Sequence, residues 1–272
     1  MRRPRPNLIL IPLLLAGLLT GEPAVAQTLR LGGTGGAMPM AEHLAEAYAA
    51  QGGPTFEIVP DLGSSGAIRA AGDGVIDLAI SSRELKTEEL ARGLKSAPLA
   101  RTPLVLITSH RSPGAIKSVD LPGLFASENP TWPDGSPVRL ILRPKSETDT
   151  AIFIAQFPGM AEALDAARQR PEIPVAATDQ DNASAAEDLP GSLVQSGLSQ
   201  IVTEKRNVRL VAIDGVEPTL ENLEKGVYPY EKRYYLVYAD KTATAAQGLL
   251  AFLRSEQGRL SLRETGSLTV AE

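Results

Sequence analysis

The sequence predicts an α/β protein, and two observations carry this prediction. Apolar strand-like runs alternate with runs of helical spacing from residue 28 onward, a pattern typical of sheets covered by helices. A short apolar strand, a loop of Gly, Ser and Thr and then a helical run occur twice, with the loops at residues 32–36 and 63–66. Glycine lets such loops turn tightly and the next helix begins with unpaired N–H groups, so two such ends facing each other would bind a small anion.

Local signals place the elements along the chain. A strand precedes each loop, at 29–31 and 56–59, and Pro39 marks the start of the first helix because a helical first turn tolerates proline. Thr87, followed by two glutamates, predicts a capped helix start, and Gly258 is expected to close the final helix. Further strands are expected at 77–80, 104–108, 138–142, 175–177, 200–202, 209–213 and 234–238, and further helices at 87–94, 121–126, 161–170, 182–187, 219–225 and 243–255.

The first 26 residues predict a secretory signal peptide. Three arginines precede an apolar run at 8–19, and Ala24-Val25-Ala26 supplies the small residues that a signal peptidase needs. Pro12 interrupts the apolar run, which is also too short to span a membrane comfortably. We therefore expect export with cleavage before Gln27 and no membrane insertion of the mature chain.

Composition narrows the possible partners. The chain carries 32 acidic and 27 basic residues, a net charge of −5, and the leader takes further positive charge with it. This balance argues against nucleic acid and anionic lipid, but not against a small anion held by backbone dipoles. With no cysteine and only two histidines, we expect no disulfide, no lipid anchor, no metal site and no cofactor.

Four motifs, taken in order, resemble those of the periplasmic phosphate-binding proteins of ABC importers. They lie at residues 32–38, 63–66, 81–83 and 143–150. The resemblance extends over essentially the whole mature chain. It implies the type II periplasmic binding protein fold, with two lobes that are each a mixed sheet flanked by helices. Lobe one would comprise residues 27–108 plus 236–272, and lobe two residues 109–235.

The resemblance also implies which residues contact the ligand. Arg143 would be the single strong cation, because its guanidinium fork matches two oxygens of a tetrahedral oxyanion. Hydroxyl and backbone N–H groups of the two Gly-rich loops would hold the other oxygens. The implied ligand residues are Thr34, Gly35, Ser64, Ser65, Gly66, Ser82, Arg143, Ser146, Thr148 and Asp149.

Two positions depart from the family's pattern. Phosphate-specific members have an Asp where this chain has Ser82, and that Asp accepts the proton of hydrogen phosphate. Asp149 either replaces this acceptor or caps the following helix. Glu147 adds a second carboxylate beside Arg143, and repulsion of several kcal/mol would oppose an anion there. We therefore expect Glu147 to face solvent or to pair with Lys145.

The function implied is capture of a tetrahedral oxyanion, phosphate first, by a monomeric periplasmic protein that delivers it to an inner-membrane ABC permease. One alternative is another oxyanion, such as tungstate, molybdate, sulfate or phosphonate. A different alternative is a periplasmic sensor or adaptor with the same fold and no transport role. An enzyme is not expected, because Gly63-Ser64-Ser65-Gly66 lacks the Gly-x-Ser-x-Gly pattern of a nucleophile elbow, and His43 and His110 are expected to be surface or packing residues.

Overall fold

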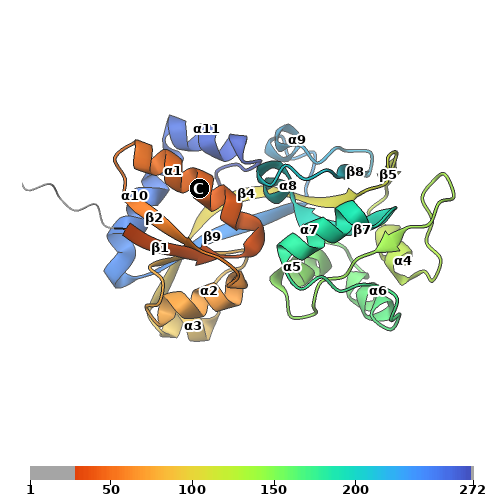
Figure 1. Ribbon diagram of the computed structural model, residues 1–272, viewed down its shortest axis with the longest axis horizontal. Helices are drawn as coiled ribbons and strands as arrows, with labels where there is room; N and C mark the ends of the chain where they lie inside the picture. Colours follow the sequence, from red (N-terminus) through yellow and green to blue (C-terminus); the bar gives the residue numbers. More distant parts are fainter. Residues whose placement is uncertain (1–27, 271–272) are drawn as a thin grey trace, which may run out of the picture.

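The computed structural model describes residues 28–270 (Figure 1). The predicted signal peptide and its cleavage site lie outside these residues. Among the described helices, none is long and apolar enough to cross a membrane. The chain forms a mixed α/β fold in which two lobes share a continuous sheet, and this confirms the predicted fold class.

The first lobe is a mixed sheet covered on both faces. Its strands, in spatial order, are β2 (Thr55–Val59), β1 (Thr28–Gly33), β3 (Leu78–Ser81), β9 (Glu231–Ala239) and β4 (Leu94–Thr108). One face carries α1 (Met38–Ala50), α10 (Ala243–Arg254) and α11 (Glu256–Glu264), and the other carries α2 (Gly63–Gly72) and α3 (Thr87–Ala91). Because side chains alternate along β9, Leu236 joins the hydrophobic cluster on the first face and Val237 the cluster on the second.

The second lobe repeats this layering on the far part of β4. Its other strands are β7 (Ser192–Gly197), β6 (Arg139–Leu140), β8 (Arg209–Ile213) and β5 (Ala115–Ile116). Leu104 and Leu106 of β4 pack with the helices α4 (Leu121–Ala126), α5 (Thr148–Gln156) and α6 (Met160–Ala167). Val105 and Ile107 face the opposite cluster, with α7 (Asp179–Asp188), α8 (Leu198–Thr203) and the start of α9 (Leu220–Glu224).

Two long strands join the lobes. From Leu94 to Pro103, β4 pairs with β9, and from Leu104 to Thr108 it pairs with β7 and β8. A register shift between Pro98 and Ala100 marks a bulge in this ribbon. The strand β4 therefore belongs to both lobes, and the lobe boundaries given above stay predictions.

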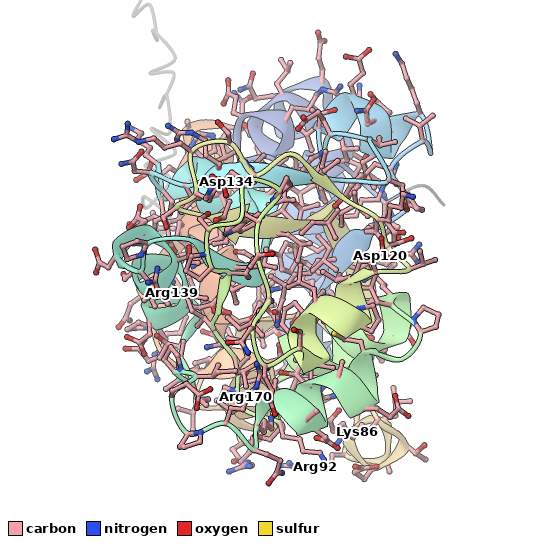
Figure 2. The ribbon with its side chains drawn as sticks, turned by 90° about the vertical axis from the view of Figure 1, so that its right-hand side faces the viewer. Lys86, Arg92, Asp120, Asp134, Arg139 and Arg170 are labelled. Carbon is pink, nitrogen blue, oxygen red and sulfur yellow. The ribbon has the colours of Figure 1, made fainter. Side chains whose placement is uncertain are left out.

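The outer end of the second lobe carries charges of both signs (Figure 2). Asp134 there accepts hydrogen bonds from Ser136 and contacts the His110 ring, and these contacts lower the pKa of Asp134 to about 2. The His110 ring also stacks on Trp132, with 5.0 Å between ring centroids. Packing and surface hydrogen bonding thus account for this histidine.

Most predicted elements are confirmed, and α4 and β8 coincide with the predictions for 121–126 and 209–213. The strand expected at 200–202 is wrong, because these residues belong to α8. The strand β7 before it was missed, since the polar residues Gln195 and Ser196 interrupt its apolar pattern. Both are buried. The Ser196 hydroxyl donates to Gln200 Oε1 at 3.0 Å, and the Gln195 backbone carbonyl accepts a hydrogen bond from Asn182 Nδ2 at 2.9 Å.

The C-terminal glycine signal was also misinterpreted. The predicted helix at 243–255 is confirmed as α10, but Gly258 does not close it. Ser255 caps a further helix, α11, by accepting a hydrogen bond from the backbone N–H of Gly258 at 3.1 Å. A Cβ atom at Gly258 would lie 2.1 Å from the Phe252 carbonyl oxygen. The glycine is therefore needed for the close approach of the two helices.

Candidate functional site

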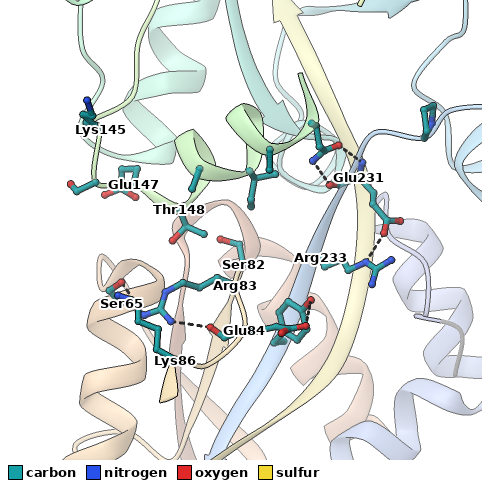
Figure 3. Close-up of a pocket in the computed structure, with 17 residues that line it drawn as sticks. Ser65, Ser82, Arg83, Glu84, Lys86, Lys145, Glu147, Thr148, Glu231 and Arg233 are labelled. Carbon is teal, nitrogen blue, oxygen red and sulfur yellow. Dashed lines mark hydrogen bonds and ion pairs between the residues drawn. The ribbon is translucent and has the colours of Figure 1, made fainter. Parts of the chain in front are cut away.

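A cleft of about 650 Å³ lies between the lobes (Figure 3). One face of α5 and the residues before it form one wall, and the first turn of α2, the residues after β3 and part of β9 form the other. Four of the ten predicted ligand residues line it. These are Ser65 and Ser82 from the first lobe and Ser146 and Thr148 from the second. The sequence motifs thus converge from both lobes on one opening.

Ser64 supports the cleft from behind. It is buried, and its Oγ accepts a hydrogen bond from the backbone N–H of Ser82 at 3.1 Å and lies 3.1 Å from the Ser82 Oγ. This pair ties the start of α2 to the end of β3 and so fixes the position of Ser82. Gly66 lies in the first turn of α2, behind the lining residues.

The first Gly-rich loop meets the second lobe directly. Thr34 is buried, and its backbone N–H donates to the Ile80 carbonyl at 2.9 Å. Beyond it, the Gly36 N–H donates to Asp179 Oδ2 at 2.7 Å, across the boundary between the lobes. A Cβ atom on Gly35 would lie 3.0 Å from the same carboxylate oxygen. Glycine therefore allows this loop to approach Asp179 closely.

Arg143 follows β6 and is 4% exposed. Its Nη1 donates to the Ala176 carbonyl at 2.8 Å, and its Nη2 donates to Asp179 Oδ1 at 3.2 Å. Glu147 lies 3.8 Å from the same nitrogen. The guanidinium predicted to hold an oxyanion thus holds a carboxylate of its own chain. Its Nε is buried without a hydrogen-bond partner among the described groups.

Asp179 is the principal site residue that the sequence analysis missed. It lies in the first turn of α7, after the N-cap Thr178. Burial disfavours its charge, but the nearby Lys232 and Arg143 and the Gly36 N–H outweigh burial, so the pKa of Asp179 is lowered. The sequence offered Thr178 and the following acids as a helix start, but no signal that one acid points inward.

Asp149 neither caps α5 nor lines the cleft. Glu147 is the N-cap of that helix, so the prediction of an Asp149 cap is wrong. Asp149 is buried and pairs with Lys232 of β9 at 2.7 Å. Burial raises the pKa of Asp149, with Lys232 opposing the shift. Burial alone would lower the pKa of Lys232, but Asp149 and Asp179 raise it.

These four side chains form a buried charge quartet, defined as Arg143, Asp179, Asp149 and Lys232. Two cations and two carboxylates make the quartet neutral overall, and Asp179 and Asp149 are close enough to influence each other's pKa. Lys232 was also missed. It precedes the buried Tyr234 and Leu236 by two and four residues. Because side chains alternate along a strand, this spacing could have predicted that Lys232 points inward.

The expectation for Glu147 is also corrected. Lys145 pairs with Asp165 at 3.0 Å rather than with Glu147. Glu147 faces the cleft, and its side chain is 38% exposed. Partial burial, with Asp179 and Asp149 nearby, raises the pKa of Glu147 against the influence of Arg143.

The cleft is lined by three further cations, of which two form ion pairs with glutamates of the chain and one does not within the part of the chain that the structure describes. Arg83 makes a two-pronged contact with Glu89, at 2.7 and 2.8 Å, and also donates to the Glu84 carbonyl at 3.0 Å and to Ser65 Oγ at 3.2 Å. Arg233 pairs with Glu231 at 2.5 Å. Lys86 Nζ has no hydrogen bond or ion pair within residues 28–270. In that same range, no group of three acidic or histidine side chains has the arrangement of a metal site.

A family model for the PBP (periplasmic binding protein) superfamily domain matches residues 20–257. The chain belongs to this superfamily. A comparison with curated proteins finds no match. Among solved structures, the chain is similar to a candidate phosphate ABC transporter substrate-binding protein from Clostridium perfringens with bound phosphate. The TM-score is 0.75 and the identity 22%, over 90% of this chain and 100% of that one.

Two further structures of PBP relatives share the fold. An ABC-type phosphate transport receptor from Vibrio cholerae matches with a TM-score of 0.63 and 18% identity, over 89% of this chain and 100% of that one. A periplasmic molybdate-binding protein from Azotobacter vinelandii matches with a TM-score of 0.60 and 14% identity, also over 89% and 100%. These likenesses confirm the type II periplasmic binding protein fold and the resemblance to phosphate-binding proteins.

Proposed function

We propose that this protein is a periplasmic solute-binding protein that captures an oxyanion between its lobes and delivers it to an inner-membrane ABC permease. The observation that carries the proposal is the convergence of Ser65, Ser82, Ser146 and Thr148, from both lobes, on one cleft. Residues that close around a solute from two sides bind it better when the lobes come together. That differential affinity drives closure, which the permease reads.

Two helix starts supply further donors for an oxyanion. The first turns of α2 and α5 carry Ser65 and Thr148, and N–H groups in a first turn have no partner within the helix. The helix dipoles favour negative charge at the same ends. The free ammonium of Lys86 adds a full positive charge at the cleft. Hydroxyls, N–H groups and one lysine can thus replace the hydration shell of a small anion.

Phosphate is the first candidate for the oxyanion because of the resemblance to phosphate-binding proteins, and one relative is named for molybdate. Ser82 stands where the family's phosphate-specific members have an Asp. A serine hydroxyl can both donate and accept, so it accommodates hydrogen phosphate as well as sulfate, molybdate or tungstate.

Calorimetry of the mature protein tests the proposal. We expect saturable one-to-one binding of at least one of phosphate, sulfate, molybdate and tungstate. Thr148→Val removes a lining hydroxyl at nearly constant volume and should weaken that binding by about tenfold, the loss of one hydrogen bond to a charged group. Thr203→Val, which changes a hydroxyl in α8 outside the cleft, is the matched control. Indifference of the protein to all four ions would refute oxyanion capture.

A second candidate is a periplasmic sensor or adaptor that keeps the fold without transport. The observation that favours it is the buried charge quartet, in which a carboxylate of the chain itself, Asp179, engages Arg143 and the Gly36 N–H. An adaptor would bind a membrane partner in a manner independent of the four ions. Co-purification with the permease and ion-dependent stimulation of its ATPase would favour transport.

Export and assembly state belong to the same proposal. The leader supports secretion into the periplasm with cleavage before Gln27, and intact-mass measurement of the exported protein tests the cleavage site. Nothing in the proposed role requires catalysis or a cofactor. We expect a monomer, which light scattering would check.

A further inference from the structure

The size of the cleft exceeds what an inorganic oxyanion needs. Its volume is about 650 Å³, whereas an ion of five heavy atoms displaces only a few water molecules of about 30 Å³ each. Cavities of roughly 300–1,000 Å³ are typical sites for organic ligands. Either most of the cleft stays filled with water, or the solute has a body as well as an anionic group.

One wall of the cleft is lined by apolar side chains of α5. Ala151, Ile152 and Ala155 project into it from α5, next to Thr148. These four positions follow the spacing i, i+3, i+4 and i+7, which places them along one face of the helix. The opposite face of α5 is buried through Phe153, and Ile152 is partly buried against the same core cluster. Ala151 and Ala155 are exposed, so this part of the apolar face is open to the cleft.

The facing wall combines an aromatic ring with polar groups. Tyr235 of β9 lines the cleft, and its hydroxyl donates to Glu84 at 3.3 Å. Gln156 holds the end of α5 against β9, because its side chain bonds both the N–H and the carbonyl of Glu231, at 2.9 and 2.8 Å. The spacing between the aromatic ring and the apolar helix face is therefore fixed by hydrogen bonds at one end of the cleft.

The cations in the cleft differ in whether a carboxylate of the chain already pairs with them. Arg83 and Arg233 are matched by Glu89 and Glu231. Lys86 Nζ makes no hydrogen bond or ion pair within residues 28–270, and Lys86 lies near Ser65 and Arg83, at the end of the cleft away from Arg233 (Figure 3). One end thus offers a cation, hydroxyls and helix N–H groups, while the middle offers apolar and aromatic surface.

We infer that the solute is an oxyanion that carries an organic substituent: a phosphonate, a sulfonate or a phosphate monoester. The anionic head lies among Lys86, Ser65, Ser82 and Thr148, and the substituent lies between Ile152 and Tyr235. This inference rests on the proposed function, since it assigns a class of solute to the same cleft. These three classes of solute share the same chemistry of recognition: a tetrahedral anionic group joined to an apolar substituent.

A series of probes with one head and a growing body tests the inference. Calorimetry would compare inorganic phosphate with methyl-, ethyl-, butyl- and phenylphosphonate on the mature protein. We expect affinity to rise by about fourfold for each methylene that becomes buried. Benzenesulfonate and phenyl phosphate, measured beside phenylphosphonate, then distinguish the three possible heads.

A matched pair of variants localises the effect. Ala155→Glu places a carboxylate on the apolar wall, at an exposed helix position, and should lower the ratio of affinities for butylphosphonate and phosphate by at least tenfold. Ala251→Glu makes the same change at an exposed position of α10, outside the cleft, and should leave that ratio unchanged. If Ala155→Glu fails to fold, the probe series on the unaltered protein decides alone.

The outcomes separate this inference from the proposed function. If phosphate binds and the substituted anions bind no better, the organic solute is refuted while oxyanion capture stands. If no ion in either series binds, both are refuted. Affinity that rises with the substituent and falls in Ala155→Glu supports both.

Discussion

The buried charge quartet and the open cleft lie side by side and use the same elements, yet they treat charge in opposite ways. In the quartet, Arg143, Lys232, Asp149 and Asp179 are between 2% and 8% exposed, and each faces an opposite charge. In the cleft, Lys86 and Lys145 are exposed, and the Lys86 ammonium has no partner within residues 28–270. A cation serves a solute only if no carboxylate of the chain has already engaged it.

This difference changes the meaning of the family motif around Arg143. In sequence, Arg143 is the strongest match to an oxyanion-binding residue. In the structure, Asp179 supplies the negative charge, and donors from both lobes hold its carboxylate. The arrangement is still that of an anion site, but the anion is tethered to the chain. Solute recognition then depends on the neighbouring hydroxyls and helix ends.

The largest expected effect comes from breaking the quartet. Lys232→Met leaves Asp149 buried without its cation, and we expect the free energy of unfolding to fall by about 3–5 kcal/mol. The double variant Lys232→Met with Asp149→Leu should recover most of this loss. Urea denaturation measures both. Lys225→Met removes an exposed partner of Glu221 and should cost less than about 1 kcal/mol. Equal losses of unfolding free energy in Lys232→Met and Lys225→Met would show that the buried ion pair is no more important for stability than the exposed one.

The next prediction tests whether Arg143 can bind a solute once its own carboxylate partner is removed. Asp179→Asn removes the tethered negative charge and leaves the guanidinium free to engage a solute. We expect phosphate affinity to rise by about tenfold, within the range of a charge-assisted hydrogen bond. Asp181→Asn, on the same turn of α7 but exposed, is the control in the same calorimetric assay. A fall in affinity in Asp179→Asn alone would show that the Asp179 carboxylate supports the solute instead of competing with it.

The smallest effect is a dependence of stability on pH. The pKa of Asp179 is lower in the folded protein than in the unfolded chain, so its contribution to stability is present above the ordinary carboxyl range. As pH falls below about 4, the unfolded chain binds the proton first and this contribution is lost. Stability should therefore fall more steeply from pH 4 to pH 2.5 in the wild type than in Asp179→Asn. Parallel urea midpoints over that range would contradict the pKa shift.

Much of the fold was readable from the sequence because local signals decide it. Apolar periodicity and capping residues located most strands and helices, including α4 and β8. The strand β7 was missed because Gln195 and Ser196, which the tertiary structure buries, interrupt its apolar pattern. In the same way, Ser255 and Gly258 looked like a helix end, although the close approach of two helices makes them a start.

The site was readable only in part, for a related reason. Ser65, Ser82, Ser146 and Thr148 were identified by motif and do meet at one cleft. Asp179 was not, because its partners, Gly36 and Arg143, lie 143 and 36 positions away in sequence. Pairings over such distances depend on how the lobes meet, which no local pattern encodes. Lys232 was also missed, although the alternation of side chains along β9 was a local signal that could have placed it inward.

The hydrogen bond between Gly36 and Asp179 has a kinetic consequence. It links the first Gly-rich loop to α7 across the lobes. A bond between the lobes favours their closed arrangement, so a solute that binds in that arrangement loses less of its intrinsic affinity to rearrangement. Entry of a solute requires the lobes to separate, which slows association relative to a protein whose lobes are not linked. Capture by this protein would accordingly be limited by its own opening rate at high cargo concentration.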